Sequence, residues 1–202
     1  MELKSTDGLK LAATYYKSAS GGREALILLH MLGRNRNDWA EFAKRAQATY
    51  DVIAVDFRGH GDSEGEIASF TEKDYLNFKL DALAAADYLD KQGKKVHAII
   101  GASIGANIAL MLAAEKKSER AVLLSPGLDY RGVKTEEHAR IFMGKLLLVA
   151  SDDDAYSANS TRKLYSMSLA KKQLKIYQTA GHGTHMFAST DLEELILDWL
   201  RH

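Results

Sequence analysis

The chain has 202 residues, of which 46% are hydrophobic and 27% are charged, as in ordinary globular proteins with one sizeable core. Basic and acidic residues number 27 each, so the formal net charge is zero, which disfavours nucleic acid or an anionic membrane as a partner. The lack of cysteine excludes disulfides, thiolate catalysis and cysteine-bound zinc. We expect no leader peptide and no membrane span, and hence a cytoplasmic protein with a single domain over residues 1–202.

The first half of the chain predicts a hairpin and then alternating strands and helices. Asp7-Gly8 stands between two apolar stretches, which indicates a β-hairpin within residues 2–17. Apolar runs without alternation are typical of strands that are buried on both faces of a parallel sheet. Such strands are predicted at residues 25–29, 52–56 and 96–101, and helices at residues 39–48, begun by Asp38, and 75–89.

The second half continues the same alternation. Strands are predicted at residues 121–124, 145–150 and 174–177, and helices at 104–114, at 161–169 and over Leu192, Leu195, Ile196, Trp199 and Leu200. Thr190 and Glu193 form a candidate capping box for the last helix. The 19-residue link from Pro126 to Gly144 holds at most a short helix, at residues 136–143. This pattern predicts an α/β fold with a doubly wound, mostly parallel sheet and minimal or no lid.

One serine is predicted at a sharp bend between a buried strand and a buried helix. Gly101-x-Ser103-x-Gly105 follows one apolar run and continues directly into another. In so tight a turn the flanking residues meet neighbouring backbone, where a Cβ would clash, which explains the two glycines. The bend exposes one hydroxyl, and Ser103 is therefore a candidate nucleophile.

Two further reactive groups follow later strands. In doubly wound sheets, ligands bind at the carboxyl ends of the strands. The acidic run 152–154 follows the strand at 145–150, and His182 and His185 follow the strand at 174–177. A serine hydroxyl is a poor nucleophile at neutral pH and needs a base such as imidazole, which a carboxylate can orient. The chain supplies these groups in the order Ser, Asp, His along one edge of the sheet.

With this order, the chain resembles the α/β-hydrolase fold family, and among its members the small lidless serine esterases and dienelactone-hydrolase-like enzymes. The resemblance spans nearly the whole chain. The motifs that carry it are Leu29-His30-x-x-Gly33, Asp56-x-Arg58-Gly59-His60-Gly61-x-Ser63, Gly101-x-Ser103-x-Gly105 and Ala180-Gly181-His182-Gly183. It implies a catalytic triad of Ser103, His182 and an aspartate.

The resemblance also favours one base and one acid among several choices. The family's histidine stands in a similar Gly-His-Gly setting, which favours His182 over His185. The family's frequent Gly-x-x-Asp pattern falls on Asp153, with Asp154 as the alternative and Asp152 as the last choice. The other two aspartates are expected to lie in a solvated loop or to cap the next helix.

The oxyanion of an acyl-transfer reaction needs preorganised donors, and here these are expected to be backbone N–H groups. The residue after the nucleophile, Ile104, supplies one. Resemblance to the family's His-Gly-x-Gly loops assigns the other to Leu32, with Met31 as the alternative. Met31 stands where the family usually has glycine, and its Cβ is tolerated if its φ is negative. His30 is expected to support this loop.

Other polar residues are expected to be structural. Asp56 and Arg58 are predicted to tie down the glycine-rich loop around His60 by hydrogen bonds. His182-x-x-His185 differs from the helical zinc spacing His-x-x-x-His and implies no third ligand, so we expect neither a metal nor a cofactor.

These residues predict the hydrolysis of small or short-chain esters through an acyl-enzyme on Ser103. The same triad fits a thioesterase or an acyltransferase, and a non-catalytic binding protein of this fold is the alternative from another class. Because the link after the sixth strand leaves little material for a lid, we expect a shallow pocket, a small-molecule ester as partner, and a monomer or homodimer. The candidate lining residues are Leu32, Trp39, Leu128, Tyr156 and Met186.

Overall fold

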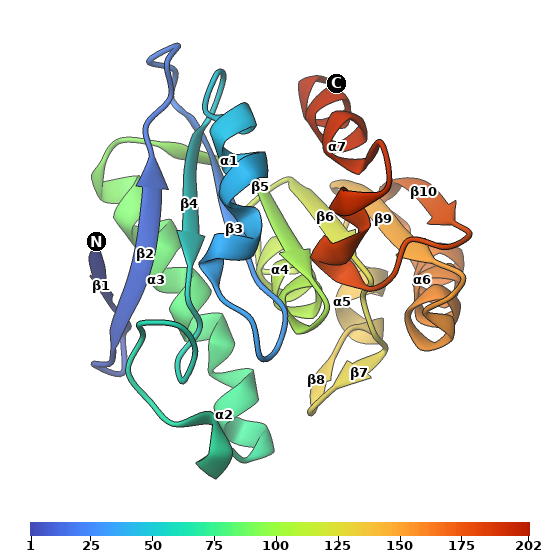
Figure 1. Ribbon diagram of the computed structural model, residues 1–202, viewed down its shortest axis with the longest axis horizontal. Coiled ribbons are helices and arrows are strands. Elements are labelled where there is room, and N and C mark those ends of the chain that lie inside the picture. Colours follow the sequence, from blue (N-terminus) through green and yellow to red (C-terminus); the bar gives the residue numbers. More distant parts are fainter.

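The computed structural model describes residues 1–202 and contains an eight-stranded sheet in the order β1-β2-β4-β3-β5-β6-β9-β10 (Figure 1). Its strands are β1 (Glu2–Lys4), β2 (Lys10–Tyr16), β3 (Glu24–Leu29), β4 (Asp51–Val55), β5 (Lys95–Ala102), β6 (Arg120–Leu124), β9 (Lys145–Ser151) and β10 (Lys171–Tyr177). The pairs β1–β2 and β2–β4 are antiparallel, and all other neighbours are parallel. The predicted mostly parallel sheet and N-terminal hairpin are therefore confirmed.

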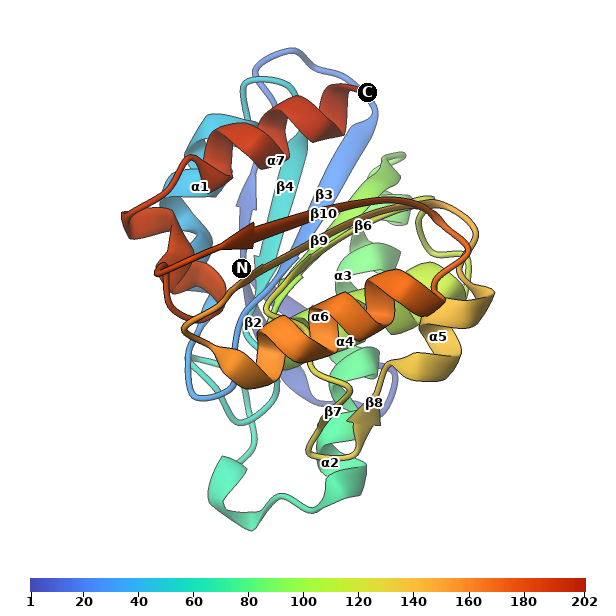
Figure 2. The same cartoon turned by 90° about the vertical axis from the view of Figure 1, so that its right-hand side faces the viewer.

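Helices cover both faces of the sheet, so that each face has its own core. They are α1 (Ala40–Ala46), α2 (Glu72–Leu76), α3 (Phe78–Lys91), α4 (Ile104–Ala114), α5 (Glu136–Ile141), α6 (Ala155–Met167) and α7 (Leu192–Arg201). Helices α1 and α7 lie on one face, and α3 to α6 on the other (Figures 1 and 2). None of the helices combines the length and the apolar character that crossing a membrane requires.

Strand β3 shows why the central strands have no alternation of polar and apolar residues. Leu26 and Leu28 pack into the core beneath α1 and α7, whereas Ile27 and Leu29 pack into the core beneath α3 and α4. Successive side chains of a strand point to opposite faces, and both faces are covered here. Every residue of β3 after Glu24 is therefore buried.

Two predicted helices of the first half begin at other residues than expected. Asp38 does not cap the helix predicted at residues 39–48, which is α1 and begins at Ala40 after Trp39. Residues Arg36–Trp39 form a 3₁₀ turn capped by Asn35, while the Asp38 carboxylate binds the guanidinium of Arg34. The single helix predicted at 75–89 is two helices, α2 and α3, which meet at Asn77.

The second half also contains three departures from the prediction. Helix α6 begins at Ala155, six residues earlier than predicted. The capping box of α7 is absent, because Thr190 Oγ1 accepts the N–H of Leu192, and Glu193 binds Arg45 instead. The link from 126 to 144 contains, besides α5, a short hairpin of β7 (Asp129–Tyr130) and β8 (Val133–Lys134).

The turn from β5 into α4 depends on close backbone contacts at two glycines. A Cβ on Gly101 would lie 2.0 Å from the carbonyl oxygen of Gly105. A Cβ on Gly105 would lie 2.5 Å from the carbonyl oxygen of Leu29 and 2.6 Å from that of His30. These contacts are backbone to backbone, so a side chain cannot move aside to relieve them. The steric reason predicted for the glycines is therefore confirmed.

We predict that Gly101→Ala destabilises the fold by about 3 kcal/mol or more, because the added methyl overlaps the first turn of α4. Gly22→Ala is the control, since the nearest atom to its Cβ would be the Ser20 hydroxyl at 3.4 Å. Urea unfolding followed by circular dichroism measures both. Equal unfolding free energies for the two variants would contradict this account of the turn.

Candidate active site

Ser103 lies at the turn between β5 and α4 in a backbone conformation that non-glycine residues rarely adopt. Its φ is 55° and its ψ is −123°, and the residue is 7% exposed. Its N–H donates to the carbonyl of Leu124 at the end of the neighbouring strand (2.8 Å). Strained backbone of this kind persists only where the surrounding structure imposes it, and such positions cluster at functional sites.

His182 follows β10, and its imidazole is held by an aspartate at the start of α6. The Nδ1 atom of His182 lies 2.5 Å from Oδ2 of Asp154. The other oxygen of this carboxylate accepts the N–H of Ser157 (3.4 Å), so that Asp154 also caps α6. The carboxylate fixes the proton on Nδ1, which leaves Nε2 free to act as a base.

The prediction of Asp153 as the partner of His182 is wrong. The Asp153 carboxylate turns back onto the Ser151 hydroxyl (2.5 Å) and the N–H of Gly181 (3.2 Å), and these hydrogen bonds lower its pKa, the one from Ser151 most. Asp152 is exposed and binds Arg162. Asp153 thus holds the start of the loop at residues 180–183, the histidine loop, and makes no hydrogen bond to the imidazole.

A helix-start signal in the sequence distinguishes Asp154 from its neighbours. Asp is among the preferred N-cap residues, and only the last aspartate of the run immediately precedes a helix. The helix predicted at 161–169 begins too late for Asp154 to be its N-cap, so the prediction did not use this signal. Because the helix begins at Ala155, its first turn fixes the direction in which Asp154 points.

The histidine loop lies against the turn that carries Ser103. The N–H of Gly183 donates to Oγ of Ser125, which follows β6 (2.9 Å). A Cβ on Gly183 would lie 3.3 Å from the Cβ of Ala102, the residue before Ser103. His185, the alternative base, is exposed, whereas Asp154 binds His182. The structure therefore brings His182, and not His185, together with Asp154, on a loop that packs against the serine turn.

Two buried histidines hold the loop after β3, the expected source of an oxyanion donor. Nε2 of His30 accepts the N–H of Phe57 (2.9 Å), and its Nδ1–H donates to the carbonyl of Met31 (2.6 Å). Nε2 of His60 accepts the N–H of Gly33 (3.0 Å). Each ring accepts a backbone proton and must therefore be neutral. The expected supporting role of His30 is confirmed.

The backbone N–H groups proposed for the oxyanion hole have no acceptor within the protein. Met31 and Leu32 make no backbone hydrogen bond through their N–H groups, and Ile104 is the first residue of α4, where no intrahelical acceptor exists. The φ of Met31 is not in the left-handed region, so its Cβ is tolerated as predicted. The choice between Leu32 and Met31 stays a prediction.

A profile of the alpha/beta hydrolase family matches residues 26–195, which include every group described above. The chain belongs to this family. Among solved structures, an esterase of Pyrococcus furiosus superimposes with a TM-score of 0.83 at 19% identity, covering 100% of this chain and 90% of that one. An esterase of Exiguobacterium antarcticum gives 0.82 at 13% identity, covering 100% and 99%. At such low identity these likenesses show the fold.

Two curated relatives with similar sequences are longer than this chain. A 2-hydroxy-6-oxononadienedioate/2-hydroxy-6-oxononatrienedioate hydrolase of Burkholderia vietnamiensis is 32% identical over 127 residues, 60% of this chain and 42% of that protein. A dihydrolipoyllysine-residue acetyltransferase component of an acetoin cleaving system, from Cupriavidus necator, is 27% identical over 122 residues, 59% of this chain and 30% of that protein. This chain thus spans less than half of either relative.

Two of the five predicted pocket residues belong to the core of this hydrolase fold. Trp39 and Met186 are fully buried in the cluster beneath α1 and α7, so their prediction as pocket walls is wrong. Both follow strand ends, but their side chains turn inward. Leu32 and Leu128 are partly buried, and Tyr156 is 48% exposed.

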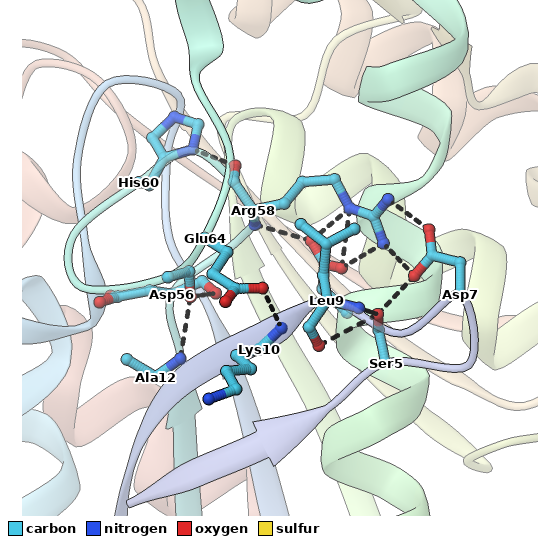
Figure 3. A network of polar contacts seen from close by, with 11 residues as sticks. Ser5, Asp7, Leu9, Lys10, Ala12, Asp56, Arg58, His60 and Glu64 are labelled. Carbon is cyan, nitrogen blue, oxygen red and sulfur yellow. Dashed lines mark hydrogen bonds and ion pairs between the residues drawn. The ribbon is translucent and has the colours of Figure 1, made fainter.

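The acidic and basic groups of the glycine-rich loop are structural, as predicted. The Arg58 guanidinium binds Asp81 of α3 (2.7 Å) and Asp7 in the β1–β2 turn (2.6 Å), and Figure 3 shows its side chain extended toward Asp7. Asp56 is fully buried and accepts the N–H groups of Arg36 (2.6 Å) and Asp62 (3.0 Å). These bonds fix the loop that carries His60.

Three residues around His182 escaped the sequence analysis: Ser125, Tyr130 and Ser157. The hydroxyl of Tyr130 lies 2.8 Å from that of Ser157, and Ser157 lies 3.4 Å from Nδ1 of His182. These serine and tyrosine residues belong to no recognisable sequence motif. Only the fold reveals that the β7–β8 hairpin and the first turn of α6 meet at the histidine.

We predict that the unfolding free energy falls as the pH is lowered from about 7 to about 4.5, partly through His30. Burial lowers the pKa of His30 from 6.5 to about 4 and also lowers that of His60. The folded state therefore binds fewer protons than the unfolded state in this window, and stability present above pH 6.5 is lost below it. At about 1.4 kcal/mol per pKa unit, His30 alone accounts for about 3 kcal/mol.

The comparison protein is His30→Gln, whose amide can accept the N–H of Phe57 without titrating. Urea unfolding across this pH range should show a shallower decline than in the wild type. An equally steep decline in both proteins would exclude His30 as a source.

Proposed function

We propose that this chain is a serine hydrolase that cleaves small or short-chain carboxylic esters through an acyl-enzyme on Ser103. The observation that carries the proposal is the bond between His182 Nδ1 and Asp154 Oδ2 (2.5 Å), on a loop packed against the turn that holds Ser103 at a φ of 55°. Structural neighbours that are esterases and a relative named as a hydrolase support the same class of reaction.

In the proposed reaction the Ser103 oxygen attacks the ester carbonyl carbon while its proton passes to Nε2 of His182. Asp154 stabilises the imidazolium that forms, and the N–H groups of Ile104 and Leu32 bind the oxyanion. The C–O bond to the alcohol then breaks, and the alcohol leaves with the proton from His182. Water attacks the acyl-enzyme by the same route in reverse, which releases the acid and restores Ser103.

The proposed preference for small substrates rests on how little of the chain is available to enclose the site. Hollows of about 580 and 530 Å³ lie at the opposite edge of the sheet, near the amino ends of β5, β6, β9 and β10. Neither contains Ser103 or His182. The link from 126 to 144 contributes only the two-residue strands β7 and β8 and the six-residue helix α5. An open site of this kind offers little apolar surface for a long acyl chain.

We predict that p-nitrophenyl butyrate is hydrolysed with a kcat/KM at least several-fold higher than p-nitrophenyl octanoate. A long chain would find no enclosed apolar wall here, and the extra methylenes would gain little on binding. Steady-state kinetics with a series of acyl lengths measures this. A kcat/KM that rises steadily up to octanoate would contradict the open-site argument.

We predict that a fluorophosphonate probe labels Ser103 covalently in the folded wild type, and that Ser103→Ala abolishes labelling. Asp154→Asn should slow labelling by about a thousandfold or more, because an asparagine neither fixes the Nδ1 proton nor balances the imidazolium. Asp152→Asn is the matched control and should label at the wild-type rate, since Asp152 binds only Arg162 and backbone.

Intact mass and gel fluorescence over time give these rates. A folded wild type that does not label would favour a non-catalytic binding protein. Slow labelling of Asp153→Asn, with Asp154→Asn unaffected, would identify Asp153 as the acid of the triad.

A further inference from the structure

We propose that Tyr130 and Ser157 are positioning residues of this hydrolase, which hold the His182 imidazole through a directed chain of hydroxyl hydrogen bonds. This inference rests on the proposed function. The chain runs from Nδ1 of His182 to Oγ of Ser157 (3.4 Å), then to Oη of Tyr130 (2.8 Å), and then to the carbonyl of Ser125 (3.3 Å).

Only one orientation of the protons gives every donor in the chain an acceptor. Nδ1 of His182 carries its proton because Asp154 accepts it. The carbonyl of Ser125 can only accept, so Tyr130 donates to it. The Ser157 hydroxyl then donates to Tyr130 and turns a lone pair toward Nδ1. In the reverse orientation the proton of Ser157 would point at the N–H of His182.

The phenol of Tyr130 is suited to this position. Burial raises its pKa to about 12, so it keeps its proton and remains a donor at neutral pH. Its ring stands edge to face against the imidazole of His182, with the centroids 6.3 Å apart. Tyr130 therefore adjoins the candidate base.

Ser125 closes the chain onto the histidine loop. Its carbonyl accepts from Tyr130, and its Oγ accepts the N–H of Gly183, the residue after His182. Ser125 is fully buried and has a φ of 50°. His182 is thus held at its ring through Ser157 and at the adjacent backbone through Gly183. Both hydrogen-bond paths end at Ser125.

The β7–β8 hairpin that carries Tyr130 is fixed to α4. The buried side chain of Asn107 donates to the carbonyl of Val133 (2.7 Å) and accepts the N–H of Gly127 (3.1 Å). A Cβ on Gly127 would lie 2.6 Å from the Tyr130 ring, so the missing side chain makes room for that ring. Both views place the hairpin beside α4, close to α2 (Figures 1 and 2).

The hairpin is also fixed to α6, the helix that carries Asp154 and Ser157. Tyr156 donates its hydroxyl proton to the carbonyl of Asp129 (2.8 Å) and accepts the N–H of the same residue (3.1 Å). The ring of Tyr156 packs edge to face on that of Tyr130. A segment bonded to two helices in this way supports a fixed position for the phenol, as a positioning residue requires.

The test is a double-mutant cycle with Tyr130→Phe and Ser157→Ala on p-nitrophenyl butyrate. Each single variant should lower kcat about three- to tenfold, the worth of one hydrogen bond, with KM within about twofold of the wild type. The double variant should lose no more than the worse single variant, because both changes break the same chain. Tyr88→Phe and Ser166→Ala, in α3 and α6 away from the site, are the matched controls and should keep the wild-type kcat.

A spectroscopic readout separates positioning from a general loss of structure. In protein labelled with ¹⁵N at histidine, the His182 Nδ1–H tautomer should dominate in the wild type and lose population in both variants, with thermal midpoints within a few degrees. If Ser157→Ala does not fold, Tyr130→Phe decides alone, since it keeps the ring that packs on Gly127.

Two results would overturn the proposal: an unchanged kcat in Tyr130→Phe, or losses that multiply in the double variant. An unchanged kcat with a raised KM would make Tyr130 a wall of the pocket. A wild type without esterase activity or fluorophosphonate labelling would overturn the proposed function and this inference together. An active wild type with an unaffected Tyr130→Phe would overturn this inference alone.

Discussion

The contact between the backbone of β3 and the first turn of α4 is the constraint on which the site depends. Gly101 and Gly105 allow three backbone segments to approach more closely than any Cβ permits. That approach forces Ser103 into a left-handed φ at the bend, with its N–H bonded to the end of β6. It also brings the loop after β3, with its free N–H groups, against the start of α4. The candidate nucleophile and the candidate oxyanion donors are thus positioned by one packing contact.

The candidate acid and base are positioned by other strand ends, and hydrogen bonds join them to each other and join the histidine loop to the end of β6. Asp154 caps α6 and binds His182, while Ser125 joins the histidine loop to the end of β6. Each of these groups follows a different parallel strand. Because parallel strands end at one edge, residues far apart in the sequence meet there, and the helix starts determine which way their side chains point.

The amino-acid sequence was sufficient to predict the groups that depend on local pattern. The apolar runs predict the strands, and Ser103, the aspartate run and His182 each directly follow one of them. The close contacts at the two glycines follow from the tightness of the predicted turn. Within the run the first choice, Asp153, was wrong and the alternative, Asp154, binds His182. The choice depends on where α6 begins, which long-range packing decides. Trp39 and Met186 were misplaced for a related reason: following a strand end does not determine whether a side chain turns toward solvent or core. Tyr130 lies in β7, and both strands of its hairpin have only two residues, which is too short to leave a pattern in the sequence.

The central claim is that Ser103 carries the acyl group during turnover. Rapid mixing of the wild type with p-nitrophenyl acetate, with quenching and intact-mass analysis, tests it most directly. We predict a burst of p-nitrophenol that matches the concentration of active sites, and a transient mass increase of one acetyl group that peptide mapping places on Ser103. Ester hydrolysis without any acetylated intermediate, or an acetyl group on another residue, would contradict the account.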